Sequence, residues 1–136
     1  MKIMTTIVER KLTAYDFMRC LFATLAKNKR SIINKTALVK EIYGFREHLQ
    51  QTSDTCISLF DDIEFRTGID NSIVSYDINN GISNLQTFGV VGKLNPTYEK
   101  LFIYLTEQEA DDILSNYAPE VKTAIATLAN QFVTGD

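Results

Sequence analysis

Apolar side chains recur every three or four residues through residues 14–27, which is the spacing of one face of an α-helix. Thr13 precedes this stripe and is suited to cap the helix. Asp16 falls in the first turn, where a carboxylate favours the positive end of the helix dipole. The basic cluster at residues 27–30 follows the stripe, at the negative end of the dipole. The pattern therefore predicts a first amphipathic helix.

A second helix is predicted directly after a very short strand at residues 31–33. Asn34 or Thr36 is suited to cap it. We expect this helix to end at Gly44, because glycine readily takes the left-handed conformation that follows many helices. The spacing of apolar residues predicts a further helix over residues 56–65, followed by a polar loop.

The stretch from Val74 to Thr106 contains the clearest pattern in the chain. Apolar residues separated by four, four and three positions predict an amphipathic helix that begins near Val74. Ser75 or Asp77 is suited to cap this helix, and Gly89 is expected to end it. The polar side of the same helix is rich in asparagine and serine.

A β-hairpin is predicted after that helix. Its first strand begins at Val90, and a proline turn lies at residues 95–97. Residues 100–105 alternate as a second strand, and both of its faces are apolar. Phe102 and Tyr104 fall on the face away from the predicted core, so we expect something, in the protein or in a partner, to cover them.

Two helices are predicted at the carboxy-terminal end. Thr106 and Glu109 have the spacing of a capping box, and Pro119 suits the first turn of the last helix. One apolar stripe of the last helix consists of Val121, Ile125, Leu128 and Phe132.

The strand and helix at residues 31–43, together with the helix, glycine and hairpin at residues 74–106, resemble a winged helix-turn-helix domain. The resemblance implies a winged-helix core with a two-stranded wing. Together with the other predicted elements, it leads us to expect one mostly helical α+β domain over residues 1–136, with an inserted helix and two carboxy-terminal helices. It departs from the family where about thirty residues separate Gly44 from Ser75, since a compact motif uses a turn of about 3–4 residues. The predicted core consists of Phe17, Leu21, Leu25, Leu38, Ile42, Phe60, Ile78, Ile82, Leu85, Val91, Leu101, Ile103 and Leu114.

Composition narrows the class of protein. A chain of 136 residues with 45% hydrophobic and 23% charged residues is typical of one globular domain. We expect a cytoplasmic protein without membrane contact, because no apolar run approaches the ~20 residues that span a bilayer or has the form of a signal peptide. Cys20 and Cys56 are expected to be small core residues, and His48 is the single histidine. Neither a metal site nor a cofactor is expected.

Charge is distributed unevenly along the chain. Residues 1–50 contain ten Lys/Arg and four Asp/Glu. Residues 51–136 contain four Lys/Arg and thirteen Asp/Glu. This polarity indicates either two charged faces or head-to-tail electrostatic complementarity with a partner. The competing interpretation is that the folded chain mixes the halves and has no charged patch.

Binding of double-stranded DNA is the first functional hypothesis, as for a small winged-helix transcriptional regulator. Asparagine, serine and threonine can hydrogen-bond base edges, whereas Lys and Arg bind phosphate. The predicted helix that begins near Val74 contains no Lys or Arg, so phosphate contacts would have to come mainly from the amino-terminal half. The predicted DNA-binding residues are Asn79, Asn80, Ser83, Asn84, Thr87, Lys93, Lys29, Arg30 and Lys35.

Protein interaction without DNA is the alternative hypothesis, as a docking module or an accessory or antitoxin-like subunit. The candidate surface, for a homodimer or a different protein, consists of Val121, Ile125, Leu128, Phe132, Phe102 and Tyr104. Packing of the last helix on the domain's own core is the favoured interpretation of its stripe. Enzymatic activity is not expected, because the adjacent carboxylates at 61–62 and 111–112 point to different sides of a helix and no nucleophile or phosphate-binding motif occurs.

Overall fold

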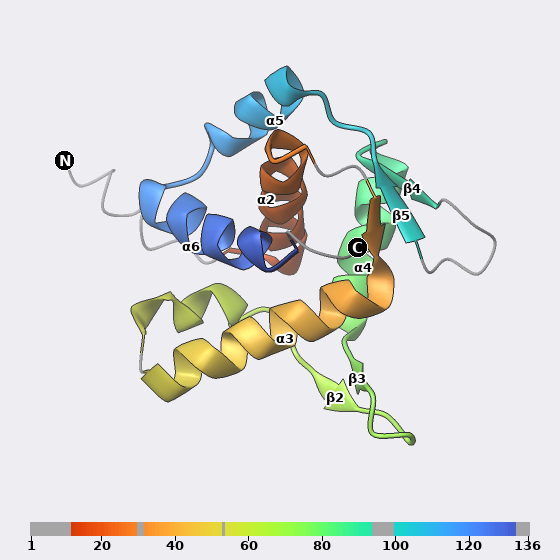
Figure 1. Cartoon of the computed structure of the whole chain (residues 1–136), viewed down its shortest axis with the longest axis vertical. Coiled ribbons are helices and arrows are strands. Elements are labelled where there is room, and N and C mark those ends of the chain that lie inside the picture. Colours follow the sequence, from red (N-terminus) through yellow and green to blue (C-terminus); the bar gives the residue numbers. More distant parts are fainter. Residues whose placement is uncertain (1–11, 30–31, 53, 94–99, 133–136) are drawn as a thin grey trace.

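The computed structural model describes residues 12–29, 32–52, 54–93 and 100–132, which form a mostly helical α+β fold (Figure 1). In chain order its elements are α2 (Ala14–Lys27), β1 (Ile32–Asn34), α3 (Lys35–Thr52), the 3-10 helix η1 (Thr55–Phe60), β2 (Arg66–Thr67), β3 (Ile73–Val74), α4 (Tyr76–Thr87), β4 (Val91–Lys93), β5 (Lys100–Ile103), α5 (Glu107–Leu114), α6 (Pro119–Ala129) and η2 (Asn130–Phe132). The predicted turn at residues 95–97 lies outside the described residues.

Helix α2 is the centre of the core. It packs against α4, α5 and α6, which surround it in Figure 1. Phe17, Met18, Leu21, Phe22 and Leu25 are almost completely buried, as the apolar spacing predicted. The predicted cap is also confirmed, because the Thr13 side chain accepts a hydrogen bond from the Asp16 amide at 3.1 Å.

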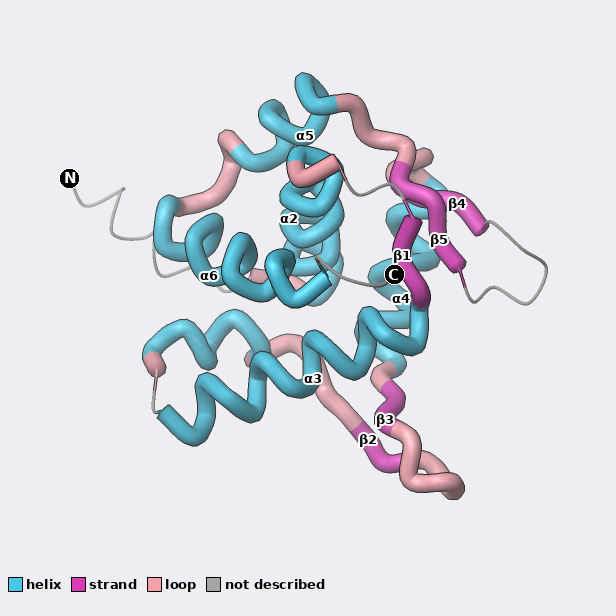
Figure 2. The backbone as a smooth tube through the Cα atoms, in the orientation of Figure 1, coloured by secondary structure: helices cyan, strands magenta, loops and turns pink. Residues whose placement is uncertain are grey.

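Strands β1, β5 and β4 form an antiparallel sheet in that order, and β2 and β3 form a separate hairpin (Figure 2). In the larger sheet, Phe102 of β5 lies opposite Ile32 of β1 and Gly92 of β4. Leu101 and Ile103 are buried on the inner face, whereas Phe102 is half-buried on the outer face. The sheet therefore joins the strand after the first helix to the predicted hairpin.

Helix α4 packs against α2, and Gly81 lies at the contact between them. A Cβ added at this buried glycine would lie 3.0 Å from Met18 Cγ, which is tighter than most side-chain contacts. The ends of α4 agree with the sequence prediction. The Ser75 side chain accepts from the Ile78 amide at the start, and Gly89 has a φ of +78° just after the end. Val90 then donates to the Leu85 carbonyl, which closes a Schellman motif.

The prediction that the second helix ends at Gly44 is wrong. Helix α3 continues through Gly44 to Thr52, because its second half buries Leu49 and packs Phe45 against the core. The Phe45 ring lies 6.2 Å from the Phe60 ring. A glycine inside a helix costs about 1 kcal/mol relative to alanine, which this burial outweighs.

The helix predicted over residues 56–65 is also different in the structure. A 3-10 helix, η1, ends at Phe60, and the hairpin of β2 and β3 follows it. Phe60 and Ile63 are buried in the core, and the Phe60 ring lies 5.2 Å from the Phe17 ring. Asp62 accepts a hydrogen bond from the Ala14 amide at 2.7 Å. The inserted segment is thus part of the core rather than an appendage.

The carboxy-terminal helices begin as predicted. Thr106 and Glu109 form the capping box at α5, and Pro119 starts α6. Ile125 and Leu128 are buried in the core, so the stripe of α6 packs inside the domain and these two side chains cannot form a partner surface. The stripe follows the favoured interpretation rather than the dimer hypothesis, with Val121 half-buried against the core. The side chain of Phe132 lies outside the described part of the chain.

The predicted core residues are buried with one exception. Leu114 is half-buried beside the core, and its neighbour Ile113 is buried in its place. The difference is a shift of one position on α5, whose buried face consists of Ala110 and Ile113.

Candidate interaction face

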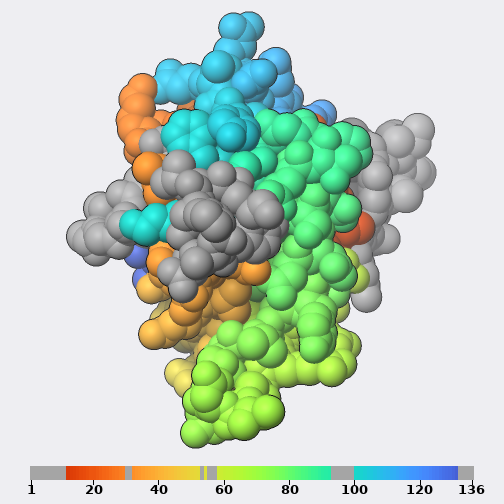
Figure 3. Space-filling model, turned by 90° about the vertical axis from the view of Figure 1, so that its right-hand side faces the viewer, coloured from red at the N-terminus to blue at the C-terminus, as the bar shows by residue number. Residues whose placement is uncertain are grey.

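One side of α4 is exposed along its whole length. The exposed positions recur at three- and four-residue spacing opposite the buried stripe of Ile78, Ile82 and Leu85. We call this surface the α4 face, and it consists of Tyr76, Asn80, Ser83, Asn84, Thr87 and the helix-ending Phe88. Figure 3 shows α4 crossing this side of the molecule between the β2–β3 hairpin and the larger sheet.

The β2–β3 hairpin borders the α4 face at the start of the helix. The Arg66 guanidinium lies 5.5 Å from the centre of the Tyr76 ring, a cation–π arrangement. Asp77 accepts a hydrogen bond from the Glu64 amide at 2.8 Å, which fixes the chain entering the hairpin against α4. Tyr76 itself is 65% exposed. The ring is therefore held in place while most of its surface faces solvent.

Phe88 borders the α4 face at the other end of the helix. It is 71% exposed, although large apolar side chains are usually buried. Its ring packs edge-on against Tyr15 of α2 at 6.0 Å, so its position is also fixed. Two exposed and positioned aromatic rings thus bracket four small polar side chains.

The outer face of the larger sheet is formed by two aromatic residues, Phe102 and Tyr104. The Phe102 and Tyr104 rings pack at 5.0 Å. Gly92 leaves room for Tyr104, because a Cβ at this glycine would lie 2.5 Å from the Tyr104 hydroxyl. Tyr104 is nevertheless 54% exposed, so it stays a candidate partner contact as predicted from the alternation.

Lys29, one of the residues predicted to bind DNA, and the nearby Lys27 form ion pairs with acidic residues of α5. Lys29 forms an ion pair with Glu107, and Lys27 pairs with Asp111 at 2.6 Å. The hydrogen bond to Asp111 raises the pKa of Lys27 above its ordinary value. These contacts link α2 to α5, which means that the basic and acidic halves of the chain mix at this point.

The remaining predicted DNA-binding residues lie in different environments in the structure. Lys35 is half-buried at the start of α3, and desolvation lowers its pKa. Arg30 and the side chain of Lys93 lie outside the described residues. Among the predicted base-contacting residues, Asn80, Ser83, Asn84 and Thr87 share the α4 face, whereas Asn79 is half-buried.

Sequence reasoning missed the two aromatic ends of this face and Arg66 beside it. A usable signal was present, because Tyr76 and Phe88 fall out of phase with the apolar stripe of α4. Both positions can therefore be read from the sequence as exposed aromatic residues at the two ends of the helix.

The part of the chain that the structure describes offers little reactive chemistry. Within it, no three or more His, Cys, Asp or Glu side chains are grouped to hold a metal ion. Burial raises the pKa of the Cys20 thiol to about 12, so this cysteine is a protonated core residue. The side chain of Cys56 lies outside the described residues. None of the described helices is long and apolar enough to cross a membrane.

Comparison with protein families, with curated proteins and with solved structures gave no match for this chain.

Proposed function

We propose that this chain is a winged-helix domain whose α4 face docks a protein partner. The element order supports the fold: α2, β1, α3 and α4 are followed by the β4–β5 hairpin, and one sheet joins β1 to that hairpin. The insertion between α3 and α4 is the departure from a compact motif.

The main support for this proposal is the residue composition of the α4 face. It is uncharged and is bracketed by the exposed rings of Tyr76 and Phe88. Protein interfaces have cores that are depleted in charge and enriched in aromatic residues. Tyr combined with Ser and Asn is typical of surfaces that bind by rigid aromatic anchors and adaptable hydrogen bonds. The partner surface should therefore be weakly charged, with apolar pockets for two rings.

DNA binding is the second candidate. It is supported by the position of an asparagine-rich helix face between two hairpins, one of which contains Arg66. It is weakened by the ion pairs that engage Lys27 and Lys29 with α5, because phosphate contacts supply most of the affinity for DNA.

A salt titration separates the two candidates. Fluorescence anisotropy with a random-sequence duplex should show no binding at low salt if the α4 face docks protein. Tight binding that weakens steeply with salt would instead establish DNA as the ligand.

Site-specific photocrosslinking tests the protein hypothesis directly. A photoreactive amino acid at Ser83, in the middle of the α4 face, should yield a protein adduct in the native cells. Gln108 is the matched control, since it is also an exposed helical position but lies on α5. Tyr76→Ala should remove the Ser83 adduct, because hot spots of interfaces are commonly buried aromatic anchors. Equal adducts from Ser83 and Gln108 would overturn the proposal.

A further inference from the structure

The exposed ridge of α4 is symmetric about the middle of the helix. It consists of residues that are each four positions apart and end at the helix cap, namely Tyr76, Asn80, Asn84 and Phe88. Residues at this spacing line up as one ridge on a helix surface. Tyr76 and Phe88 lie six positions before and after Ile82, and the two asparagines lie two positions before and after it. The ridge therefore has the same order of aromatic and amide side chains in both directions.

An antiparallel copy of α4 is a surface that this ridge fits. In a two-fold symmetric dimer, every contact between two residues occurs twice with the copies exchanged. Because the ridge is symmetric, one register places Tyr76 beside the partner's Phe88 and Asn80 beside the partner's Asn84. Packing between rows of residues four positions apart is the commonest way in which helices cross, at an angle of about −50°. A single arrangement thus satisfies both the aromatic ends and the amide centre.

The middle of the ridge is uncharged, which suits self-pairing. Residues near a two-fold axis lie close to their own copies, so a charged side chain there would be repelled by its copy. The amide groups of Asn80 and Asn84 each contain both donors and an acceptor, so they can hydrogen-bond to each other across the axis. Neither side chain is hydrogen-bonded to another described residue. The neighbouring Ser83 and Thr87 are small and exposed, which leaves room for the ridge of the second copy.

The two ends of the ridge also complement each other. The Arg66 guanidinium lies 5.5 Å from the centre of the Tyr76 ring, and the Phe88 ring packs on Tyr15 at 6.0 Å. The antiparallel register brings Arg66 towards the carboxy-terminal end of the partner's α4, whose last turn contains no basic residue. A cation is favourable there because that end of the helix dipole is negative. The Tyr76 ring and the partner's Phe88 ring form an aromatic contact in the same register.

We propose that the partner of the α4 face is a second copy of this chain, docked as an antiparallel pair of α4 helices. The inference rests on the proposed function, because it names the partner of the same face. Figure 3 shows that α4 lies at the surface on this side of the molecule, where a second helix can reach it. A contact built mainly on one helix pair is small beside the ~800 Å² per partner of a standard interface. The dimer therefore dissociates on dilution.

A charge exchange at the two asparagines tests the register. In one variant Asn80→Glu is combined with Asn84→Glu, and in the other Asn80→Lys is combined with Asn84→Lys. Each variant alone places like charges beside each other across the axis, so its self-association should weaken at least tenfold. An equimolar mixture of the two variants should form a heterodimer, because opposite charges then meet. Sedimentation velocity of the full chain over about 1–100 µM measures both effects.

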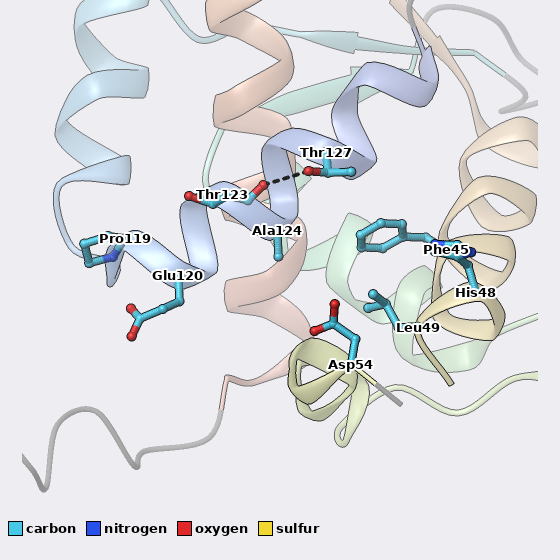
Figure 4. Close-up of a pocket in the computed structure, with 9 residues that line it drawn as sticks. All are labelled: Phe45, His48, Leu49, Asp54, Pro119, Glu120, Thr123, Ala124 and Thr127. Carbon is cyan, nitrogen blue, oxygen red and sulfur yellow. Dashed lines mark hydrogen bonds between the residues drawn. The ribbon is translucent and has the colours of Figure 1, made fainter. Parts of the chain in front are cut away.

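The groove between α3 and α6 provides the matched control (Figure 4). Thr123 and Thr127 line this groove from α6, and both are exposed and four positions apart, like the two asparagines. Thr123→Glu combined with Thr127→Glu adds the same charge to a different helix surface and should leave self-association unchanged. Far-UV circular dichroism checks that each variant keeps the helical content of the wild type.

Three results would overturn the second copy as partner. They are a wild-type chain that stays monomeric over the whole range, a mixture of the Glu and Lys variants that does not associate, and a loss of the dimer in the α6 control variant. Photocrosslinking from Ser83 separates this inference from the proposed function. A monomeric chain whose Ser83 adduct contains a different protein refutes the second copy and supports the docking role, whereas a Ser83 adduct no stronger than that from Gln108 refutes both.

Discussion

Replacing Gly44 by alanine should stabilise the protein. Gly44 lies in the interior of α3, is exposed, and has nothing within 4 Å of the position that a Cβ would take. Alanine therefore meets no steric obstacle. In a helix interior it is favoured over glycine by about 1 kcal/mol, because glycine loses more backbone entropy on folding.

For a chain of this length, that gain raises the melting temperature by roughly 3 °C. Thermal and urea unfolding followed by far-UV circular dichroism measure the change. Gly89→Ala is the matched control, because a Cβ there also meets nothing within 4 Å but the backbone has a φ of +78°. Forcing alanine into that left-handed conformation should destabilise the protein by about 1 kcal/mol.

A loss of stability in Gly44→Ala would refute the reasoning. It would show that Gly44 needs a left-handed conformation and that α3 ends there, as glycine's usual role at helix ends predicted. The second half of α3, which buries Leu49, would then be placed differently.

Three further predictions concern caps, packing and ionisation. Thr106→Ala should destabilise the protein by about 1 kcal/mol in urea unfolding through loss of the capping box of α5, whereas Thr106→Ser should stay near wild type; equal losses would contradict the capping role. Gly81→Ala should lower stability by about 1 kcal/mol despite the helix preference of alanine, because the buried Met18 must move; a gain like that of Gly44→Ala would show a looser contact between α2 and α4. Stability should fall as pH rises from 9 towards 12 by up to about 1.4 kcal/mol per pH unit, because the Cys20 thiol of the unfolded chain ionises near its ordinary pKa of 9.0 while burial raises the pKa in the folded state to about 12. Cys20→Ala should flatten the first part of that decline, and an unchanged pH profile would contradict the assignment.

Local signals in the sequence were sufficient to locate most helix starts. Thr13, Ser75, Thr106 and Pro119 act within one helical turn, so their effect does not depend on the rest of the fold. The apolar spacing of α2 and α4 likewise predicted their buried faces. These elements are the ones in which local preference and tertiary packing agree.

The two elements whose predicted bounds were wrong, α3 and η1, depend on contacts between residues that are far apart in the sequence. Gly44 permits a helix end but does not require one, and the burial of Leu49 decides that α3 continues. The 3-10 helix η1 ends at Phe60, whose ring packs on the rings of Phe17 and Phe45. These contacts decide the conformation of η1, whereas the spacing of apolar residues within the segment predicted an α-helix. No periodicity in one segment reports such contacts.

The same division applies to the candidate face. Spacing along α4 predicted that Asn80, Ser83, Asn84 and Thr87 share one surface. It did not predict that Lys29 is paired with Glu107, because the two residues are 78 positions apart. Such a pairing is set by the tertiary fold, so spacing within one helix does not report it.

The most direct test of the docking proposal is the comparison of photocrosslinks from Ser83 with those from Gln108. We predict a protein adduct from Ser83 that is lost in Tyr76→Ala and is not formed from Gln108. Sedimentation of the purified chain then shows whether the partner is a second copy. A nuclease-sensitive adduct from Ser83, or an adduct that persists unchanged in Tyr76→Ala, would contradict the account.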